Sequence, residues 1–213
     1  MSVHKIYSFF LLLILSPCTL LAQNASELLS KAAQVYEQSN GISATFTFHT
    51  RMDGMGAESF EGLIEMKGDR FVLKTPDMQI WYDGSTQWVY VERNDEVNIT
   101  NPTGEELEST NPMILLRTYS KEYNAKLKGE STAASGKMAY DIELTPKRKK
   151  DIERIELQLE KNSQLPFRIA VYAKNGMYTM IQIVKMETGK NQPDNYFVFN
   201  EKAYPDVEVI DLR

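Results

Sequence analysis

Few side chains in this sequence have the types and spacing that catalysis needs. His49 is the one histidine beyond the first 22 residues, so a Ser-His-Asp triad or a histidine metal site would need partners that the sequence does not mark. It lies on the polar side of an alternating segment, and we expect it at the surface. Asp and Glu number 29, yet no pair stands in a distinctive setting, which leaves a secreted two-carboxylate hydrolase as a minor alternative. We predict a protein that is not an enzyme and uses no metal or cofactor.

The single cysteine, Cys18, lies in a segment typical of an export signal. The apolar run over residues 6–15 follows a short basic start and is too short to span a bilayer. We predict a signal peptide over residues 1–22, removed after Ala22, and one domain over residues 23–213. A second interpretation is a lipoprotein cleavage box in which Cys18 becomes lipidated. Pro17 argues against it, since it stands where a small residue is expected.

The charge of the chain is acidic, −5 for the whole sequence. Loss of Lys5 with the leader leaves 23 basic residues against 29 acidic ones, a charge of −6. This balance argues against nucleic acid as a partner. The densest basic run is Lys147, Arg148, Lys149 and Lys150. Such a run suits a solvated hairpin tip, and the alternative is contact with anionic head groups or with an acidic membrane partner.

The segment Gly62–Val91 says most about how the chain folds. Large apolar residues alternate with polar ones, and the runs meet at Gly68-Asp69 and at Asp83-Gly84. Asp-Gly between alternating runs favours a hairpin, because glycine supplies the positive φ that such turns need. We therefore predict a β-meander with one apolar face.

Two helical segments and further strands surround this meander. Asn24 and Glu27 resemble a capping box that begins an amphipathic helix, which Asn40-Gly41 ends. Residues 101–107 suit a short helical turn, and Asn111-Pro112 begins a helix whose first turn is wholly apolar. This many antiparallel strands predict a sandwich or a curled barrel, with the helices plugging its open side. Further strands are expected at 42–49, 60–67, 96–100, 123–129, 138–144, 152–160, 167–173, 177–186 and 196–199.

The set of segments resembles a known family, the periplasmic outer-membrane lipoprotein carrier proteins, or LolA family. The resemblance rests on Phe46-Thr47-Phe48, on Gly62–Phe71, on Trp81-Tyr82-Asp83-Gly84 with Trp88 and Tyr90, on Glu96-Val97, and on Asn111–Leu116. It implies a mainly β (α+β) fold: an open, incomplete antiparallel β-barrel of about 10–11 strands with a helical lid inside the concave face.

The resemblance also implies a function. Such a protein is a monomer in the periplasm that takes acylated lipoproteins from an inner-membrane lipoprotein-releasing transporter. It passes them to an outer-membrane acceptor. The alternatives are a carrier of another lipid or glycolipid, or a lipid-anchored outer-membrane receptor if Cys18 is modified.

The expected binding residues are apolar, and several are methionines, whose flexible thioethers suit variable ligands. The resemblance implies a lid-latching arginine at a place that falls on Gly68 in this chain. Either Arg70, two residues on, takes that role, or the lid is held by packing alone. The expected lid residues are Leu28, Leu29, Val35, Met113, Ile114, Leu115 and Leu116. The expected lipid cavity is lined by Phe46, Phe48, Ile64, Met66, Phe71, Leu73, Met78, Ile80, Tyr82, Met138, Tyr140 and Ile142.

Overall fold

The computed structural model describes residues 18–52, 54–104, 106–107, 111–133 and 136–213. They form one open sheet of twelve strands in the order β12-β6-β5-β4-β3-β2-β1-β11-β10-β9-β8-β7, with β12 and β7 at its two edges. All neighbours pair antiparallel except β12, which runs parallel to β6. The expected mainly β fold with helices is therefore confirmed, as an open sheet that does not close into a barrel.

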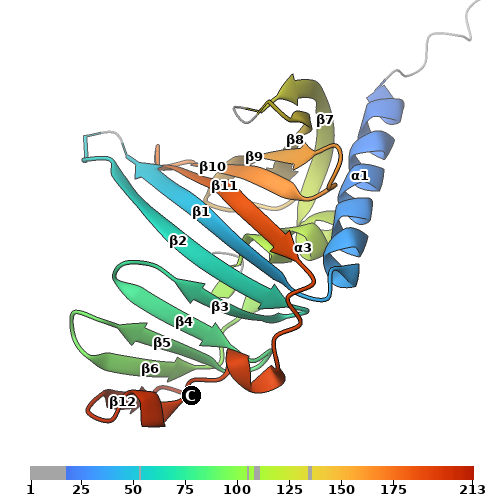
Figure 1. Ribbon diagram of the computed structural model, residues 1–213. Helices are drawn as coiled ribbons and strands as arrows, with labels where there is room; N and C mark the ends of the chain where they lie inside the picture. Colours follow the sequence, from blue (N-terminus) through green and yellow to red (C-terminus); the bar gives the residue numbers. More distant parts are fainter. Residues whose placement is uncertain (1–17, 53, 105, 108–110, 134–135) are drawn as a thin grey trace, which may run out of the picture.

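The sheet bends strongly, so that β7–β9 stand across the direction of β1 and β2 (Figure 1). Helix α1 lies along the side of β7 and touches α3 (Figure 1). The helices are α1 (Cys18–Gln38), the 3-10 turn η1 (Pro112–Ile114) and α3 (Leu115–Glu122). The strands are β1 (Ile42–Arg51), β2 (Glu58–Lys67), β3 (Arg70–Lys74), β4 (Met78–Tyr82), β5 (Gln87–Val91), β6 (Glu96–Thr100), β7 (Tyr123–Thr132), β8 (Met138–Pro146), β9 (Ile152–Glu160), β10 (Pro166–Ala173), β11 (Tyr178–Thr188) and β12 (Glu208–Asp211).

Helix α1 forms because its apolar residues recur at helical spacing. Ala25, Leu29, Ala32 and Tyr36 are all buried, each 4% exposed or less, and residues three and four apart share one face of a helix. The expected end is confirmed, since Asn40 (φ 53°) and Gly41 (φ 100°) take the left-handed conformation. The expected beginning is wrong. The helix runs from Cys18 through Asn24, so Asn24 does not cap it, because residues 18–23 hold neither proline nor glycine to stop it.

The expected turns and the second helix are where the sequence placed them. Gly68 (φ 60°) and Gly84 (φ 104°) take the predicted positive φ at the β2–β3 and β4–β5 turns. Asn111 is 1% exposed, and its Oδ1 accepts a hydrogen bond of 3.0 Å from the Met113 N–H. This bond satisfies a donor that the start of a helix leaves free, so η1 and α3 begin where Asn111 predicts.

The C-terminal segment differs from expectation. Residues 196–199 were expected as a strand, but Asp194–Phe197 is a 3-10 helix (η2) and Glu201–Ala203 is another (η3). Pro193 starts the first turn, and its carbonyl accepts from the Tyr196 N–H at 3.0 Å. The segment then adds β12 beside β6 at the bottom of the molecule (Figure 1). Its aromatic residues pack on the sheet face opposite the helices, which we call the outer face.

We expect Gly62 to be required by close packing of its neighbours. A Cβ added there would lie 2.3 Å from Phe46 Cζ and 2.9 Å from the Lys74 carbonyl oxygen. Gly62→Ala should therefore lower the free energy of unfolding by about 1–3 kcal/mol through overpacking. Gly56→Ala is the matched control, because an added Cβ meets no atom within 4 Å, and it should change stability by at most about 0.5 kcal/mol. Urea unfolding midpoints measure both, and equal midpoints would contradict the packing argument.

Candidate functional site

Most residues expected to line a cavity meet on the inner face, the sheet face that carries the helices. They form one apolar cluster that spans β1 to β4 and continues across β8 to β10. Phe71 is fully buried, and Met66 and Ile142 are 2% exposed or less. We call this set the inner cluster. Its expected members are Phe46, Ile64, Met66, Phe71, Ile80, Tyr82 and Ile142, with Phe48, Leu73 and Tyr140 partly buried against them.

The helices cover this cluster with the residues that the sequence predicted. Leu29, Met113, Leu115 and Leu116 are each 6% exposed or less and belong to the same cluster. Leu28, Val35 and Ile114 are partly buried against it. The helices α1, η1 and α3 therefore cover the inner cluster. We call these three elements the lid.

Two of the expected cavity residues lie outside the inner cluster. Met78 is 39% exposed and Met138 is 46% exposed. Each is the first residue of its strand, β4 and β8 respectively. A side chain at a strand end lies beyond the covering helices, so the alternation of the strand does not bury it. The structure does not bring Met78 and Met138 to the site.

The lid is fastened to the β2–β3 turn by polar contacts from both helices. Tyr36 of α1 donates its hydroxyl to the Gly68 carbonyl at 2.8 Å. Arg117 of α3 forms an ion pair with Asp69 of the same turn, and its Nε lies 3.7 Å from Glu37 Oε1. The Tyr119 hydroxyl also donates to the Ser26 carbonyl at 2.9 Å, which joins α3 to α1. We call the contacts at Gly68 and Asp69 the turn latch.

Arg70 does not take part in the turn latch, which corrects the sequence prediction. Its Nη1 pairs with Asp194 Oδ1 at 2.5 Å, and its guanidinium lies 5.5 Å from the centre of the Phe197 ring. The reason is strand alternation, because Phe71 points to the inner face and its neighbours on β3 must point outward. The arginine that holds the lid is Arg117, on the helix and not on the strand.

Sequence reasoning missed Arg117 and Tyr36 as fastening residues. Arg117 follows an apolar helical turn and reads as an ordinary exposed residue of an amphipathic helix. Only the position of Asp69, 48 residues earlier in the sequence, gives it a partner. The signal that could have found the contact is Gly68-Asp69 itself, a tight turn with a carboxylate that faces the lid.

The basic run Lys147–Lys150 is partly occupied by contacts within the chain. Lys147 Nζ donates to the Ser120 carbonyl at 2.5 Å, and Lys150 Nζ lies 3.3 Å from Glu122 Oε2. Arg148 and Lys149 are exposed. The β8–β9 hairpin therefore rests on the end of α3, with two of its four cations directed to solvent.

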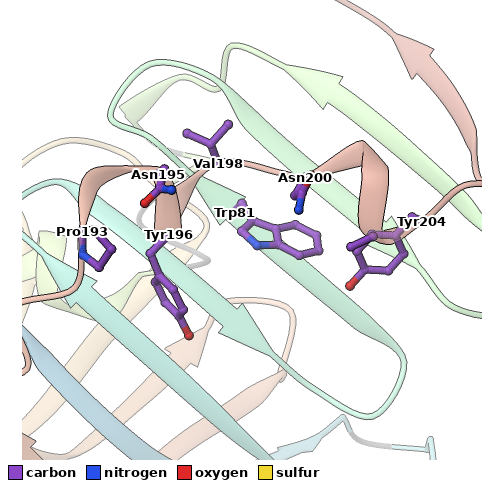
Figure 2. A pocket seen from close by; sticks show the side chains of 8 residues that line it. Trp81, Pro193, Asn195, Tyr196, Val198, Asn200 and Tyr204 are labelled. Carbon is purple, nitrogen blue, oxygen red and sulfur yellow. The ribbon is translucent and has the colours of Figure 1, made fainter.

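A separate shallow pocket of about 370 Å³ lies on the outer face, beneath the C-terminal segment. The indole of Trp81 lies between Tyr196 and Tyr204, with Asn195 and Asn200 above it (Figure 2). The ring centres of Trp81 and Phe199 are 5.2 Å apart, so this pocket belongs to the packing of the C-terminal segment on β4. The sheet separates it from the inner cluster.

Groups for catalysis or metal binding do not converge in the described part of the chain. His49 pairs in register with Met180 and Ser59, and no side-chain hydrogen bond joins its imidazole to another described residue. Among those residues, no group of three His, Cys, Asp or Glu side chains could hold a metal ion. Within the same residues, no helix has the length and apolar character to cross a membrane.

Comparison with known proteins agrees with this geometry. The family model described as outer membrane lipoprotein carrier protein LolA matches residues 15–175. The chain belongs to the LolA family. Comparison with curated proteins gives no match. Members of this family are in general binding or carrier proteins that act outside the cytoplasm, and not enzymes.

Two solved structures share the fold of this chain at low sequence identity. An uncharacterised conserved protein from Thermus thermophilus is 15% identical with a TM-score of 0.62, over 89% of this chain and 99% of its own. A DUF1329 family protein from Desulfovibrio piger is 17% identical with a TM-score of 0.51, over 86% of this chain and 99% of its own. Such identities show the fold alone.

We expect the turn latch to weaken at alkaline pH. Burial raises the pKa of Tyr36 from 10.0 to about 12. The folded state therefore holds this proton more tightly than the unfolded state. Stability is fully present below about pH 10 and falls as the pH rises through 12, with a slope of up to about 1.4 kcal/mol per pH unit.

Tyr36→Phe separates the two effects. At about pH 8 it should cost about 1 kcal/mol, through loss of the hydrogen bond to the Gly68 carbonyl. Between about pH 10 and 12 it should lose less stability than the parent, because it has no phenol to ionise. Some decline remains, since burial and the Glu65 carboxylate also raise the pKa of Tyr196. Urea unfolding across this pH range measures the difference, and parallel curves would contradict the role given to Tyr36.

Proposed function

We propose that this protein is a periplasmic carrier that binds the acyl chains of lipoproteins on its inner face and transfers them between membranes. The observation that carries the proposal is an apolar inner cluster that the sheet alone leaves uncovered and that the three elements of the lid cover. The carrier would receive its cargo from an inner-membrane lipoprotein-releasing transporter and deliver it to an outer-membrane acceptor. The family to which the chain belongs supports the same function.

The chemistry of the inner cluster suits acyl chains. Its members are aliphatic and aromatic, with Met66 and Met113 among the buried residues. Such a surface binds ligands by removing apolar area from water and makes few directional demands. One site could therefore accept chains attached to many different proteins.

The closed lid sets how tightly a ligand can bind. Met113, Leu115, Leu116 and Tyr119 are all buried, and exposing them would cost roughly 2 kcal/mol each, or about 8 kcal/mol together. An acyl chain gains ~0.8 kcal/mol for each buried methylene. About ten methylenes therefore offset the cost of opening, and only the remainder appears as affinity. A carrier that must release its ligand needs such an opposing cost.

The polar contacts of the turn latch determine where the lid sits on the apolar inner cluster. Arg117 is 37% exposed and Asp69 is 60% exposed, so their ion pair contributes little to stability. It fixes where the lid sits, however, because Tyr36 reaches the same turn from the other helix. The lid can leave the turn at a small electrostatic cost and return to one defined position.

Cross-linking the lid to the turn tests whether the inner cluster is the binding site. Asp69→Cys with Arg117→Cys places thiols at the turn latch for a short bis-maleimide linker. The unlinked variant should bind a fluorescent long-chain fatty acid, and the linked one should bind at least about tenfold more weakly, because its lid cannot leave. Fluorescence titration measures both affinities.

The matched control links neighbouring strands without touching the lid. Lys128 on β7 and Glu143 on β8 form an ion pair with Nζ and Oε2 3.4 Å apart, and cysteines at these positions should accept the same linker. Binding should then be unchanged. Equal binding by the lid-linked and the unlinked protein would overturn the proposed site.

Depletion of the protein in its native cells tests the transport function. If it carries lipoproteins, its loss should leave lipoproteins at the inner membrane, which fractionation followed by immunoblotting detects. Unchanged sorting, together with retained fatty-acid binding, would indicate a carrier of another lipid. Mass spectrometry of the mature N-terminus distinguishes a soluble carrier from a receptor lipidated at Cys18.

A further inference from the structure

Two arginines on the outer face converge on one tyrosine. The Arg51 guanidinium lies 5.0 Å from the centre of the Tyr178 ring, and Arg168 Nη2 lies 3.2 Å from the Tyr178 hydroxyl oxygen. Arg51 ends β1, Tyr178 begins β11, and the two residues pair in register. The neighbouring Tyr172 ring is 5.1 Å from Tyr178. Cations and phenols are thus gathered at one end of the sheet.

These two arginines have no carboxylate partner among the described residues. Arg168 Nε instead meets the Met180 sulfur at 3.3 Å. The contrast is Arg154 next to them, which lies over the Tyr172 ring and pairs with both Glu153 and Glu156 at 3.3 Å. In a protein with a net charge of −5, two adjacent arginines without a counter-ion form a local site for anions.

Exposed methionines stand beside this site. Met55 is 71% exposed in the β1–β2 connection, and Met177 is 39% exposed in the β10–β11 connection. The two connections are neighbours, because β1 pairs with β11 and Arg51 lies opposite Tyr178. Lys174, also exposed, belongs to the second connection. The exposed methionines therefore lie in the connections beyond the strand ends, and Arg51 and Tyr178 lie at the strand ends themselves.

We propose that this surface docks the protein on membranes that carry anionic phospholipids. We call it the docking tip and define it by Met55, Met177, Lys174, Arg51, Arg168 and Tyr178. The methionines enter the boundary between head groups and acyl chains. Tyr178 lies at head-group level, where aromatic side chains with a polar end are favoured, and the arginines bind phosphate oxygens. Apolar insertion beside a basic cluster is the combination that interfacial membrane binding uses.

The net negative charge of the chain would orient the protein so that the docking tip faces the membrane. The acidic remainder of the surface is repelled by an anionic bilayer, so attraction is confined to the docking tip. An acidic protein partner would be attracted by the arginines alone and would leave the exposed methionines without a role. The methionines therefore favour a bilayer.

Docking at this tip would also place the bilayer near the inner cluster. Phe48 and Phe60 stack with ring centres 4.6 Å apart on the inner side of β1 and β2, close to Arg51 in the sequence. Both are only partly buried. This consequence rests on the proposed function, whereas membrane docking itself does not.

Vesicle co-sedimentation tests the proposal. The exported protein carrying Cys18→Ser, so that no lipid anchor contributes, is mixed with phosphatidylcholine vesicles with or without phosphatidylglycerol. We expect binding to the anionic vesicles that weakens as salt screens the charges. Arg51→Gln with Arg168→Gln should reduce binding about 10- to 30-fold. Met55→Ser with Met177→Ser should reduce it about fivefold or more.

The control variant makes the same charge change elsewhere. Lys126→Gln with Lys202→Gln alters two exposed lysines away from the tip and should bind like the parent. Circular dichroism checks that every variant is folded. No binding to anionic vesicles, or equal weakening by the control pair, would overturn the proposal. Binding that is lost with the arginine variant but unchanged in the methionine variant would also overturn it, because the methionines are what favours a bilayer over an acidic protein partner. Fatty-acid titration of the same variants should be unchanged, so failure of docking and failure of the acyl site are separate results.

Discussion

The structure depends on one constraint, that an open sheet cannot bury its own inner face. A closed barrel brings its far wall over its interior, whereas here β12 and β7 remain separate edges. The lid supplies the missing wall with two apolar surfaces, Ala25–Tyr36 of α1 and Met113–Leu116 of η1 and α3. The same apolar contacts that stabilise the fold therefore cover the surface that, in the proposed function, would take the acyl chains in place of the lid.

The outer face of the sheet also carries apolar side chains that the sheet itself cannot bury, and the C-terminal segment covers them. Strands β3 and β4 are apolar on both sides, with Phe71 and Tyr82 inward and Val72 and Trp81 outward. The C-terminal segment buries the outward set beneath Phe197 and Phe199, and Arg70–Asp194 and Tyr196–Glu65 tie it down. β12 then adds main-chain bonds to β6. One side of these strands is therefore held in place by contacts that do not involve the lid.

Much of the fold could be predicted because it is encoded locally. Alternation over Ile42–Phe48, the glycines at 68 and 84, and the cap at Asn111 each act within a few residues. The apolar pattern also identified most of the side chains under the lid, but not all, since Met78 and Met138 lie outside the inner cluster. The fastening contacts could not be found this way, because Arg117 and Asp69 are far apart in the sequence and become neighbours only when the chain folds. The C-terminal segment was misread since an alternating aromatic pair suits a strand, whereas Pro193 and the apolar outer face favour a 3-10 turn.

The position of the turn latch explains how small contacts can control a large apolar surface. Gly68 and Asp69 form a two-residue turn between paired strands, so the backbone there is held on both sides. Tyr36 and Arg117 reach this rigid point from two different helices, and Tyr119 joins those helices to each other. Three elements are thus coupled through a few polar atoms. In the proposed function, movement of α3 would strain the contacts of α1 at the same turn, so the three elements would open together. Such an opening would expose the whole inner cluster at once, as the proposed ligand with several acyl chains requires.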